Sequence, residues 1–354
     1  MQKILISTGG TGGHVIPAQN IKEHLEDDFE VFYATDIRGL KYLSSNTDRT
    51  IIIDTPKLNL SFLLPYKILK IIFLIFKSLF YLKNNKFKKV ISIGGYMSIP
   101  IIISAKILRI NILLVEPNLV LGKGNKFFLN FATKILCYSN QLSNFPKKYL
   151  DRIKLIKPLI SKAFYEVEKI EKIDDKFCFL IVGGSQGAKI FDEILKEVIL
   201  EISRDFSIKI IQQTHKDNID NLKNFYVSNN IDNLIFNFEE NFFDLINVSD
   251  LCITRAGATT LAEISFLNKP FIAIPLPYSK DNHQMMNAKY YEKKGCCWVI
   301  DQKKLDKEKL SIFIKDLLKD KKDLINKKKN LQKLNHDNTR KYIYDELKRI
   351  INEN

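Results

Sequence analysis

Short apolar runs recur along the chain, and most are followed by a glycine or polar turn and then by residues with a helical period. This alternation is typical of parallel strands joined by crossover helices, so it predicts an α/β protein. Six strands are expected in the first half, at residues 4–7, 31–34, 51–53, 90–93, 112–115 and 135–137. Six more are expected in the second half, at residues 177–182, 209–212, 234–236, 251–253, 271–274 and 298–300.

The two halves begin in the same way. An apolar strand leads into Gly9-Gly10 in the first half and into Gly183-Gly184 in the second, and a helix is expected after each pair. We therefore predict two doubly wound parallel sheets. A proline and a run of alternating charges between residues 157 and 176 separate the halves, so we expect one domain at 1–158 and another at 159–354.

The chain becomes rich in lysine after Leu305 and keeps a helical period to its end. Its last stretch, about residues 337–352, predicts an amphipathic helix. The sequence leaves open whether this helix packs within the second domain or back on the first.

The most apolar segment covers residues 60–82. Its longest uninterrupted apolar run is 71–76, far short of the roughly 20 residues that a membrane-spanning helix needs. At 100° per residue, Lys67, Lys70 and Lys77 fall within about 80° of one another, which leaves the remaining circumference apolar. Two interpretations stay open: a core helix, or a helix whose outer edge enters a membrane interface with its lysines at the headgroups.

Composition narrows the class of protein. The chain has 55 Lys and Arg against 40 Asp and Glu, a net charge of +15, which favours anionic lipids or phosphorylated ligands. Because the lysines also cover ordinary solvent faces, we expect no nucleic acid partner. Five cysteines form no Cys-x-x-Cys pair, so neither disulfides nor a zinc site is indicated, and no signal peptide is apparent. A cytoplasmic protein is expected.

The strongest local motif lies between the first strand and the first helix, at residues 7–17. Four glycines, Gly9, Gly10, Gly12 and Gly13, let the backbone approach a ligand closely, and the helix N-terminus adds positive potential, so we expect a phosphate site. The motif lacks a Gly-Lys-Ser/Thr ending, and no acidic residue at a convincing offset completes a dinucleotide fingerprint. His14 is either a hydrogen-bond donor to the loop or to phosphate, or a general base.

The second half carries three candidate ligand loops. Residues 183–188 repeat the strand-to-helix glycine turn and include Ser185 and Gln186. Residues 254–260 lead into a helix bearing Glu263, which could accept hydrogen bonds from a ribose diol or form a surface salt bridge. Residues 280–284 form a polar loop after a buried strand, where a sugar could bind.

The chain offers no obvious metal site. It contains no Asp-x-Asp, and its five histidines are scattered. Glycine loops and helix N-termini would then stabilise the charge of a leaving phosphate group.

These motifs, in this order, resemble the MurG family of peptidoglycan N-acetylglucosaminyltransferases, in the GT-B superfamily, along nearly the whole chain. The matching residues are Gly9, Gly10, Thr11, Gly12, Gly13, His14, Pro17, Gly94, Gly95, Tyr96, Pro100, Glu116, Asn118, Gly122, Asn125, Lys126, Gly183, Gly184, Ser185, Gln186, Gly187, Ala188, Arg255, Gly257, Ala258, Glu263, Asp281, Gln284, Asn287 and Ala288.

The resemblance implies two Rossmann-like domains facing across a cleft. It also implies inverting transfer of N-acetylglucosamine from UDP-N-acetylglucosamine to the C4 hydroxyl of the muramyl sugar of lipid I. The product is lipid II, which serves cell wall biogenesis, cell shape and cell division. The first domain would bind lipid I and an anionic membrane surface, and the second the donor, at the cytoplasmic face of the plasma membrane. No cofactor would be required, although a divalent metal could stimulate the reaction.

The resemblance also assigns the site residues. The donor would contact Thr11, Gly12, Gly13, Asn118, Ser185, Gln186, Phe238, Arg255, Glu263 and Gln284. The acceptor would contact Gly10, His14, Gly95, Tyr96, Asn118 and Asn125. His14 is the first candidate for the catalytic base and Glu116 the second.

Three departures from the family pattern affect the first domain. The chain has Glu116-Pro117-Asn118 where Glu-Gln-Asn is usual, and Gly124 where Thr is usual. It also has Lys157-Pro158-Leu159-Ile160 in place of Asn-Pro-Val-Arg. Lys157 or Lys162 could substitute for the missing arginine.

Other functions remain to be weighed. One is a GT-B glycosyltransferase with another lipid or small-molecule acceptor, and another is a non-catalytic UDP-sugar-binding protein of the membrane surface. A nicotinamide oxidoreductase is disfavoured, because no ribose-binding acid is apparent after the second strand.

Overall fold

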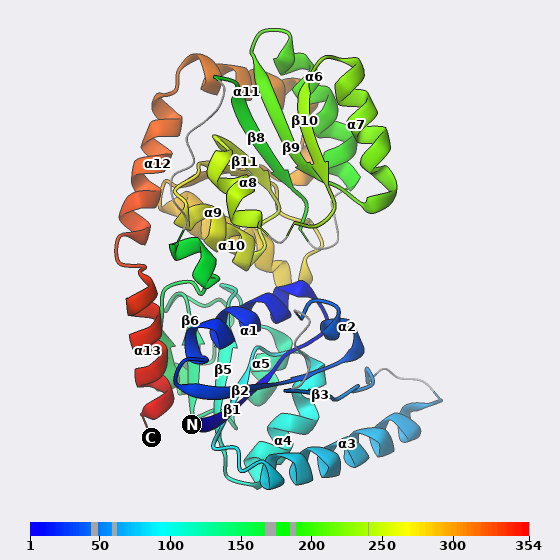
Figure 1. The fold of residues 1–354 in the computed structure, drawn as a ribbon, viewed down its shortest axis with the longest axis vertical. Coiled ribbons are helices and arrows are strands. Elements are labelled where there is room, and N and C mark those ends of the chain that lie inside the picture. The colour runs from blue at the N-terminus through cyan, green and yellow to red at the C-terminus, as the bar shows by residue number, and fades with distance from the viewer. Residues whose placement is uncertain (44–48, 59–61, 167–174, 185–188, 240, 354) are drawn as a thin grey trace. The chain divides into compact units, whose positions relative to one another are not determined.

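The computed structural model describes residues 1–43, 49–58, 62–166, 175–184, 189–239 and 241–353, and they form two compact units (Figure 1). The first unit consists of Met1–Lys162 and Thr339–Asn354, and the second of Ala163–Asn338. The chain therefore leaves the first unit once and returns to it for its last helix.

The first unit is built on a seven-stranded sheet with the order β3-β2-β1-β4-β5-β6-β7, in which all neighbours are parallel. Its strands are β1 (Gln2–Ser7), β2 (Phe29–Thr35), β3 (Thr50–Ile52), β4 (Lys89–Ser92), β5 (Asn111–Glu116), β6 (Lys134–Cys137) and β7 (Ile153–Leu155). The strand order reverses at β1, and loops at such a switch point commonly bind ligands beyond the carboxyl ends of the strands.

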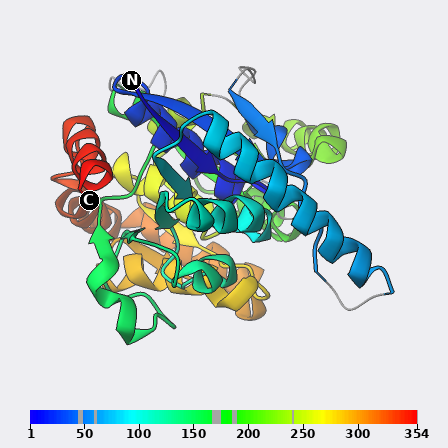
Figure 2. The ribbon, with the colours of Figure 1, turned by 90° about the horizontal axis from the view of Figure 1, so that it is seen from below.

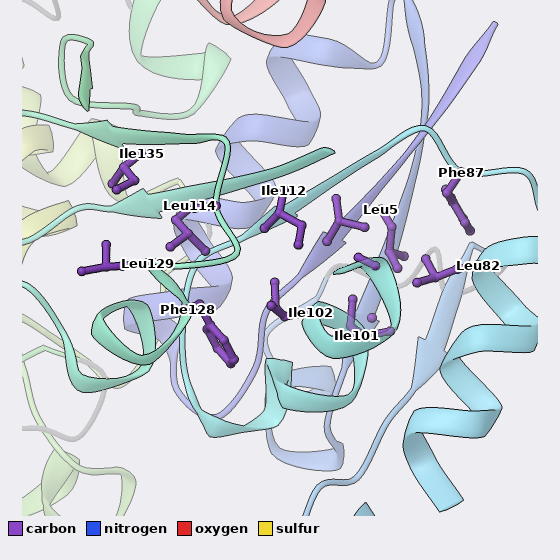
Figure 3. Packing of buried hydrophobic residues seen from close by; sticks show 14 of the residues in the cluster. Leu5, Leu82, Phe87, Ile101, Ile102, Ile112, Leu114, Phe128, Leu129 and Ile135 are labelled. Atoms are coloured by element: carbon purple, nitrogen blue, oxygen red, sulfur yellow. The ribbon is translucent and has the colours of Figure 1, made fainter. Parts of the chain in front are cut away.

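Helices cover this sheet. They are α1 (Gly12–Leu25), α2 (Ile37–Leu40), α3 (Leu64–Asn84), α4 (Ile99–Ile107), α5 (Lys123–Phe128) and α13 (Arg340–Asn352), with 3₁₀ turns at Tyr96–Ser98 and Lys147–Arg152. Figure 3 shows how the core fills: Leu5 and Ile112 from the strands meet Ile101 and Ile102 of α4, and Phe128 of α5 lies beside them. All five side chains are buried.

The second unit has a six-stranded parallel sheet with the order β10-β9-β8-β11-β12-β13. Its strands are β8 (Phe177–Val182), β9 (Ile208–Gln213), β10 (Asp232–Phe236), β11 (Leu251–Thr254), β12 (Phe271–Ala273) and β13 (Cys297–Val299). Its α-helices are α6 (Lys196–Ser203), α7 (Ile219–Ser228), α8 (Phe242–Val248), α9 (Ala258–Phe266), α10 (His283–Lys293), α11 (Lys307–Lys319) and α12 (Lys322–Asn335). A π-helical turn at Phe191–Leu195 precedes α6, and 3₁₀ turns occur at Lys162–Tyr165, Lys216–Asn218, Lys280–Asn282 and Gln302–Lys304.

The twelve predicted strands are all present, and the predicted α/β class is confirmed. The prediction missed β7, which has three residues, Ile-Lys-Leu, and pairs only with β6 at the edge of the sheet. A strand this short gives neither an apolar run nor a clear alternation.

The first unit extends past the predicted boundary at residue 158. Asn20 on α1 donates a hydrogen bond from Nδ2 to the carbonyl of Leu159 at 3.0 Å. The backbone N–H of Lys162 donates to Glu23, also on α1, at 2.8 Å. These bonds fix residues 159–162 to α1, so the chain enters the second unit only at Ala163.

The last helix, α13, belongs to the first unit and packs on α1. Nζ of Lys348 lies 2.7 Å from the carboxylate of Asp28, just before β2. Lys134 of β6 donates from Nζ to the carbonyl of Ile350 and to the carboxylate of Glu353, at 2.9 and 3.1 Å. Polar contacts therefore hold this helix on the first unit. The sequence had left open which unit it packs on.

Helix α3 has two apolar faces. Ile71, Leu74 and Leu82 are buried against the rest of the unit, whereas an exposed apolar stripe follows the opposite face. The stripe consists of Phe62, just before the helix, and Tyr66, Leu69, Phe73, Phe76 and Phe80. Figures 1 and 2 show that the N-terminal end of α3 reaches beyond the other elements of its unit.

Two of the four lysines on α3 lie toward β3. Lys70 pairs with Asp54 at 3.7 Å, and Lys77 donates to the carbonyl of Ile52 at 3.3 Å. A core helix would not leave a continuous apolar stripe in water, and such patches commonly mark interaction sites. The structure thus favours the interfacial interpretation, and among the described residues no helix is long and apolar enough to cross a membrane.

We expect the double substitution Phe73→Ser and Phe76→Ser to reduce binding to anionic lipid vesicles. These side chains are 67% and 57% exposed, and each would contribute about 1.5–3 kcal/mol on leaving water. Vesicle sedimentation at two salt concentrations measures the effect. High salt should weaken wild-type binding too, because it screens lysines close to the headgroups.

A matched control removes two exposed apolar side chains elsewhere. Ile312 on α11 and Ile325 on α12 are 60% and 50% exposed, and their double Ser variant should bind vesicles as wild type does. If the wild-type protein does not sediment with anionic vesicles at low salt, the interfacial interpretation is wrong.

Candidate functional site

Three glycine turns meet at the carboxyl edge of the first sheet. They follow the neighbouring strands β1, β4 and β5 and contain Gly9–Gly13, Gly94-Gly95 and Gly122–Gly124. A Cβ atom at Gly95 would lie 3.9 Å from Nε2 of His14, and one at Gly124 would lie only 2.6 Å from the backbone nitrogen of Gly95. The threonine usual at position 124 would therefore not fit this backbone.

The first turn leaves backbone amides for a ligand. Thr11 is the N-cap of α1 but makes no side-chain capping bond. Within the described part of the chain, the N–H groups of Gly12 and Gly13 have no hydrogen-bond acceptor, as expected for the first turn of a helix. Uncapped amides at a helix N-terminus suit an anion such as phosphate.

An acidic residue follows the second strand, and its contacts decide whether it could bind a ribose. Asp36 follows β2 directly and is buried, and its Oδ1 accepts hydrogen bonds from the backbone N–H groups of Gly10 and Gly39, each at 2.8 Å. Its Oδ2 accepts from Nε of Arg38 at 2.9 Å. Burial alone would raise the pKa of Asp36, but these hydrogen bonds hold it below its usual value. The carboxylate is thus engaged by the chain itself instead of being open to a ribose.

Glu116 is also engaged by its own loop. Its Oε1 accepts from the backbone and side-chain nitrogens of Asn118, both at 3.2 Å. Its Oε2 accepts from the backbone of Gly122 at 2.8 Å and from Nδ2 of Asn125 at 3.0 Å. Burial raises its pKa, against the effect of these donors. A carboxylate with four internal donors is poorly placed to take a proton from a sugar, so the geometry favours a positioning role and leaves His14 as the candidate base.

Two other predicted acceptor residues, Asn125 and Tyr96, differ in how far their side chains are exposed to solvent. Asn125 is buried and also donates from Nδ2 to the carbonyl of Val115 at 3.0 Å, so it supports the loop from within. Tyr96 lies at the edge, where its hydroxyl accepts a hydrogen bond from Nη2 of Arg38. Asp36 and Arg38 were not among the predicted site residues.

The structure separates the two candidates for the missing arginine. Lys162 pairs with Glu26 and Asp27, at 3.8 and 3.2 Å, near the C-terminal end of α1. That end of α1 lies toward the amino edge of the sheet, so Lys162 does not substitute. Lys157 follows the carboxyl end of β7 and stays a candidate.

The carboxyl edge of the second sheet carries the other predicted loops. They follow the neighbouring strands β8, β11 and β12. Gly184, after β8, has a φ of +79°, a conformation that favours glycine. Ser185 and Gln186 lie outside the described residues.

Arg255, directly after β11, is a buried cation. It is 7% exposed, donates from Nη1 to the carbonyl of Ile274 at 2.9 Å, and lies 4.7 Å from the ring centre of Phe191. Burial lowers its pKa to about 10. No carboxylate of the described residues pairs with it, so an anionic ligand would supply the missing counter-charge.

Glu263 on α9 is a buried carboxylate. It is 9% exposed, and burial raises its pKa to about 8. No group in the described ranges donates a hydrogen bond to it, so the alternative of a surface salt bridge is wrong. Its oxygens could accept hydrogen bonds from vicinal hydroxyls of a ligand.

Other donor-site candidates flank this edge, whereas the four that the resemblance assigned within the first half of the chain, Thr11, Gly12, Gly13 and Asn118, belong to the first unit. Oε1 of Gln284, in the first turn of α10, accepts from the backbone N–H of Leu276 at 2.9 Å, which fixes the side chain beneath the loop after β12. Phe238 follows β10 and is exposed, as expected for a residue that could stack on a base. Asn287 on α10 donates to the carbonyl of Ala256 at 3.1 Å and so joins α10 to the Arg255 loop.

Comparisons with known proteins agree with this layout. The N-terminal domain model of glycosyltransferase family 28 matches residues 4–137, and the C-terminal domain model matches 178–343. The crystal structure of Acinetobacter baumannii MurG is similar over 99% of this chain and 100% of its own, with a TM-score of 0.77 and 24% identity. A curated relative from Pelagibacter ubique (strain HTCC1062) is 45% identical over 354 residues, 100% of this chain and 99% of its own length. The chain belongs to the MurG family.

The Pelagibacter relative is named UDP-N-acetylglucosamine–N-acetylmuramyl-(pentapeptide) pyrophosphoryl-undecaprenol N-acetylglucosamine transferase. A relative with the same name from Rickettsia bellii (strain RML369-C) is 36% identical over 94% of this chain and 95% of its own length. The predicted GT-B fold is confirmed by the MurG structure and by the two parallel sheets. The roles that the family resemblance assigns to single residues stay predictions.

Glu263 provides a pH-dependent prediction. With a pKa of about 8, its carboxyl group is protonated at neutral pH in the empty site. Ribose hydroxyls would bind the ionised form better, so UDP binding should release a proton and tighten as pH rises toward 8, by at most about tenfold per unit. Calorimetry in buffers of different ionisation enthalpy measures both effects.

Glu263→Gln and Glu263→Ala should weaken UDP binding about 10–100-fold at pH 8 and remove this proton release. Glu308→Gln, which changes an exposed carboxylate on α11, serves as control and should bind UDP normally. Unchanged UDP affinity in both Glu263 variants would exclude Glu263 from the donor site.

Proposed function

We propose that this chain transfers N-acetylglucosamine from UDP-N-acetylglucosamine to the C4 hydroxyl of the muramyl sugar of lipid I, with inversion, and so forms lipid II for peptidoglycan. The observation that carries the proposal is the 45% identity to the curated Pelagibacter relative over the whole chain. Because this match covers both units, it supports the same donor and the same acceptor. Nothing observed favours a different acceptor or a non-catalytic protein.

The second unit would bind the donor. Arg255 would neutralise the diphosphate, since this buried cation has no carboxylate partner among the described residues. Glu263 would accept the ribose hydroxyls, and Gln284 would contact the transferred sugar. Phe238 would stack on the uracil, and Ser185 and Gln186, outside the described residues, would contact the diphosphate or the nucleotide.

The first unit would bind the acceptor at the three glycine turns. Transfer is one in-line displacement: the C4 oxygen of the acceptor forms a bond to C1 of N-acetylglucosamine while the bond from C1 to the UDP oxygen breaks. The hydroxyl proton passes to Nε2 of neutral His14, because both oxygens of Glu116 are engaged. Arg255 and the N-terminus of α9 stabilise the charge of the departing UDP.

The protein would act at the cytoplasmic face of the plasma membrane as a peripheral protein. The exposed apolar stripe of α3 would enter the interface, and the basic charge of the chain would favour anionic lipid. No nucleic acid partner is proposed.

Transfer should proceed in excess EDTA. The chain has no Asp-x-Asp, and the described residues include no group of three or more His, Cys, Asp or Glu placed to hold a metal. Incubation with UDP-N-acetylglucosamine and a lipid I analogue, followed by chromatography of the disaccharide product, tests both the function and its metal dependence.

UDP binding without any product would support the non-catalytic alternative. Product formation that EDTA abolishes and magnesium restores would show that a metal, and not the protein alone, neutralises the diphosphate.

His14→Ala should lower kcat about 10²–10⁴-fold with little change in either KM, as expected for the loss of a general base. Steady-state kinetics with both substrates measure this. His336→Ala, which removes an exposed histidine, is the control. A raised acceptor KM at unchanged kcat would instead assign His14 to phosphate binding.

A further inference from the structure

The carboxyl edge of the first sheet carries an arginine that sequence patterns did not single out. We propose that Arg38, held in place by Asp36, binds the diphosphate of the acceptor beside the glycine turn that starts α1. This inference rests on the proposed function and names a binding residue for it.

Asp36 fixes the guanidinium. Nε and Nη2 of Arg38 lie 2.9 and 2.5 Å from Oδ2 of the buried carboxylate, and Nη2 also donates to the hydroxyl of Tyr96. Nη1 donates to no group in the described part of the chain, and the side chain is 47% exposed. Arg38 therefore presents free N–H groups in a fixed orientation.

The same carboxylate couples Arg38 to the glycine turn. Oδ1 of Asp36 accepts from Gly10, and Nη2 of Arg38 would lie 3.7 Å from a Cβ atom at Gly10. A Cβ atom at Gly39 would lie 2.7 Å from Cα of Gly9, so the backbones of α2 and of the turn are in direct contact. The guanidinium and the amides of the turn are thus held as one rigid surface.

The charges around Arg38 favour an anion. Asp36 neutralises one positive charge, but Lys57 lies 5.9 Å from the ring centre of Tyr96, and Cζ of Arg38 lies 5.4 Å from the same centre. The nearby carboxylate of Asp54 pairs with Lys70 at 3.7 Å. Two cations therefore flank Tyr96.

A diphosphate fits this surface. The two free N–H groups of Nη1 of Arg38 can each donate to a phosphate oxygen, and the uncapped amides of Gly12 and Gly13 can bind further oxygens. Donor and acceptor both carry a diphosphate. The family resemblance assigned Gly12 and Gly13 to the donor. We assign this surface to the acceptor instead, because all its residues belong to the first unit and Arg255 of the second unit is available to the donor.

The test compares Arg38→Gln with a matched control. Arg49 is also an exposed arginine beside an acidic residue and over an aromatic ring, 4.0 Å from Glu30 and 5.9 Å from the ring centre of Phe32. It precedes β3, so it lies at the opposite edge of the sheet. Both variants lose one positive charge from the same unit.

We expect Arg38→Gln to raise the KM for a lipid I analogue about 10–100-fold, the loss of one or two charge-assisted hydrogen bonds, with a donor KM within about twofold of wild type. Arg49→Gln should behave as wild type. Arg38→Lys should recover part of the effect, because it keeps the charge but lacks the planar guanidinium that Asp36 holds in place.

A second measurement separates binding from support of the fold. Inorganic pyrophosphate should compete with the acceptor, and Arg38→Gln should weaken that inhibition by a similar factor while Tm and UDP affinity stay unchanged. A wild-type acceptor KM in Arg38→Gln, a rise in the donor KM alone, or unchanged pyrophosphate inhibition with a lowered Tm would overturn the inference. Failure of the proposed function would instead appear in the wild-type protein, as no product from the lipid I analogue.

Discussion

A carboxylate removed from water must find hydrogen-bond donors, and this requirement organises the carboxyl edge of the first sheet. Asp36 and Glu116 each accept four hydrogen bonds from groups close to them in the fold. Asp36 connects the end of β2 to the turn after β1, and Glu116 connects the end of β5 to the start of α5. These bonds fix the turn after β1 and the turn after β5, and the turn after β4 lies between them because β4 is the neighbour of both strands. This edge of the first sheet is therefore preorganised by internal charge.

The second unit is arranged differently. Arg255 and Glu263 are both buried, yet the described residues give neither of them an oppositely charged partner. Burial opposes the charged form of each, which lowers one pKa and raises the other. The diphosphate of a nucleotide would pair with Arg255, and its ribose hydroxyls would donate hydrogen bonds to Glu263. Part of the binding energy would then offset the cost of burying these two charged groups. The two units thus contribute in different ways. In the first unit the buried carboxylates are already hydrogen-bonded within the protein, whereas in the second unit the buried charged groups need a ligand as partner.

The sequence predicted the strands well because buried parallel strands form continuous apolar runs, and it failed at β7, where three edge residues carry no such signal. The glycine turns were also predictable, since their function depends on the local backbone. The role of Asp36 was not, because it depends on a contact with Gly10, 26 residues away, and on burial that only the tertiary structure creates. For the same reason the sequence did not show that Asn125, an acceptor contact by resemblance, and Glu116, the second candidate base, are both buried. Lys162 was a plausible substitute for an arginine until α1 placed it at the other edge.

Helix α13 has a consequence for how the protein is made. It packs on α1, its Lys348 pairs with Asp28 just after that helix, and its own Ile350 and Ile351 are buried in the first unit. These residues follow the second unit in the chain, so a nascent chain exposes that part of α1 while the whole second unit emerges from the ribosome. At about 5–20 residues per second, the interval lasts on the order of ten seconds or more. The first unit can therefore be completed only after the second unit has been made, which couples its final stability to successful synthesis of residues 163–338.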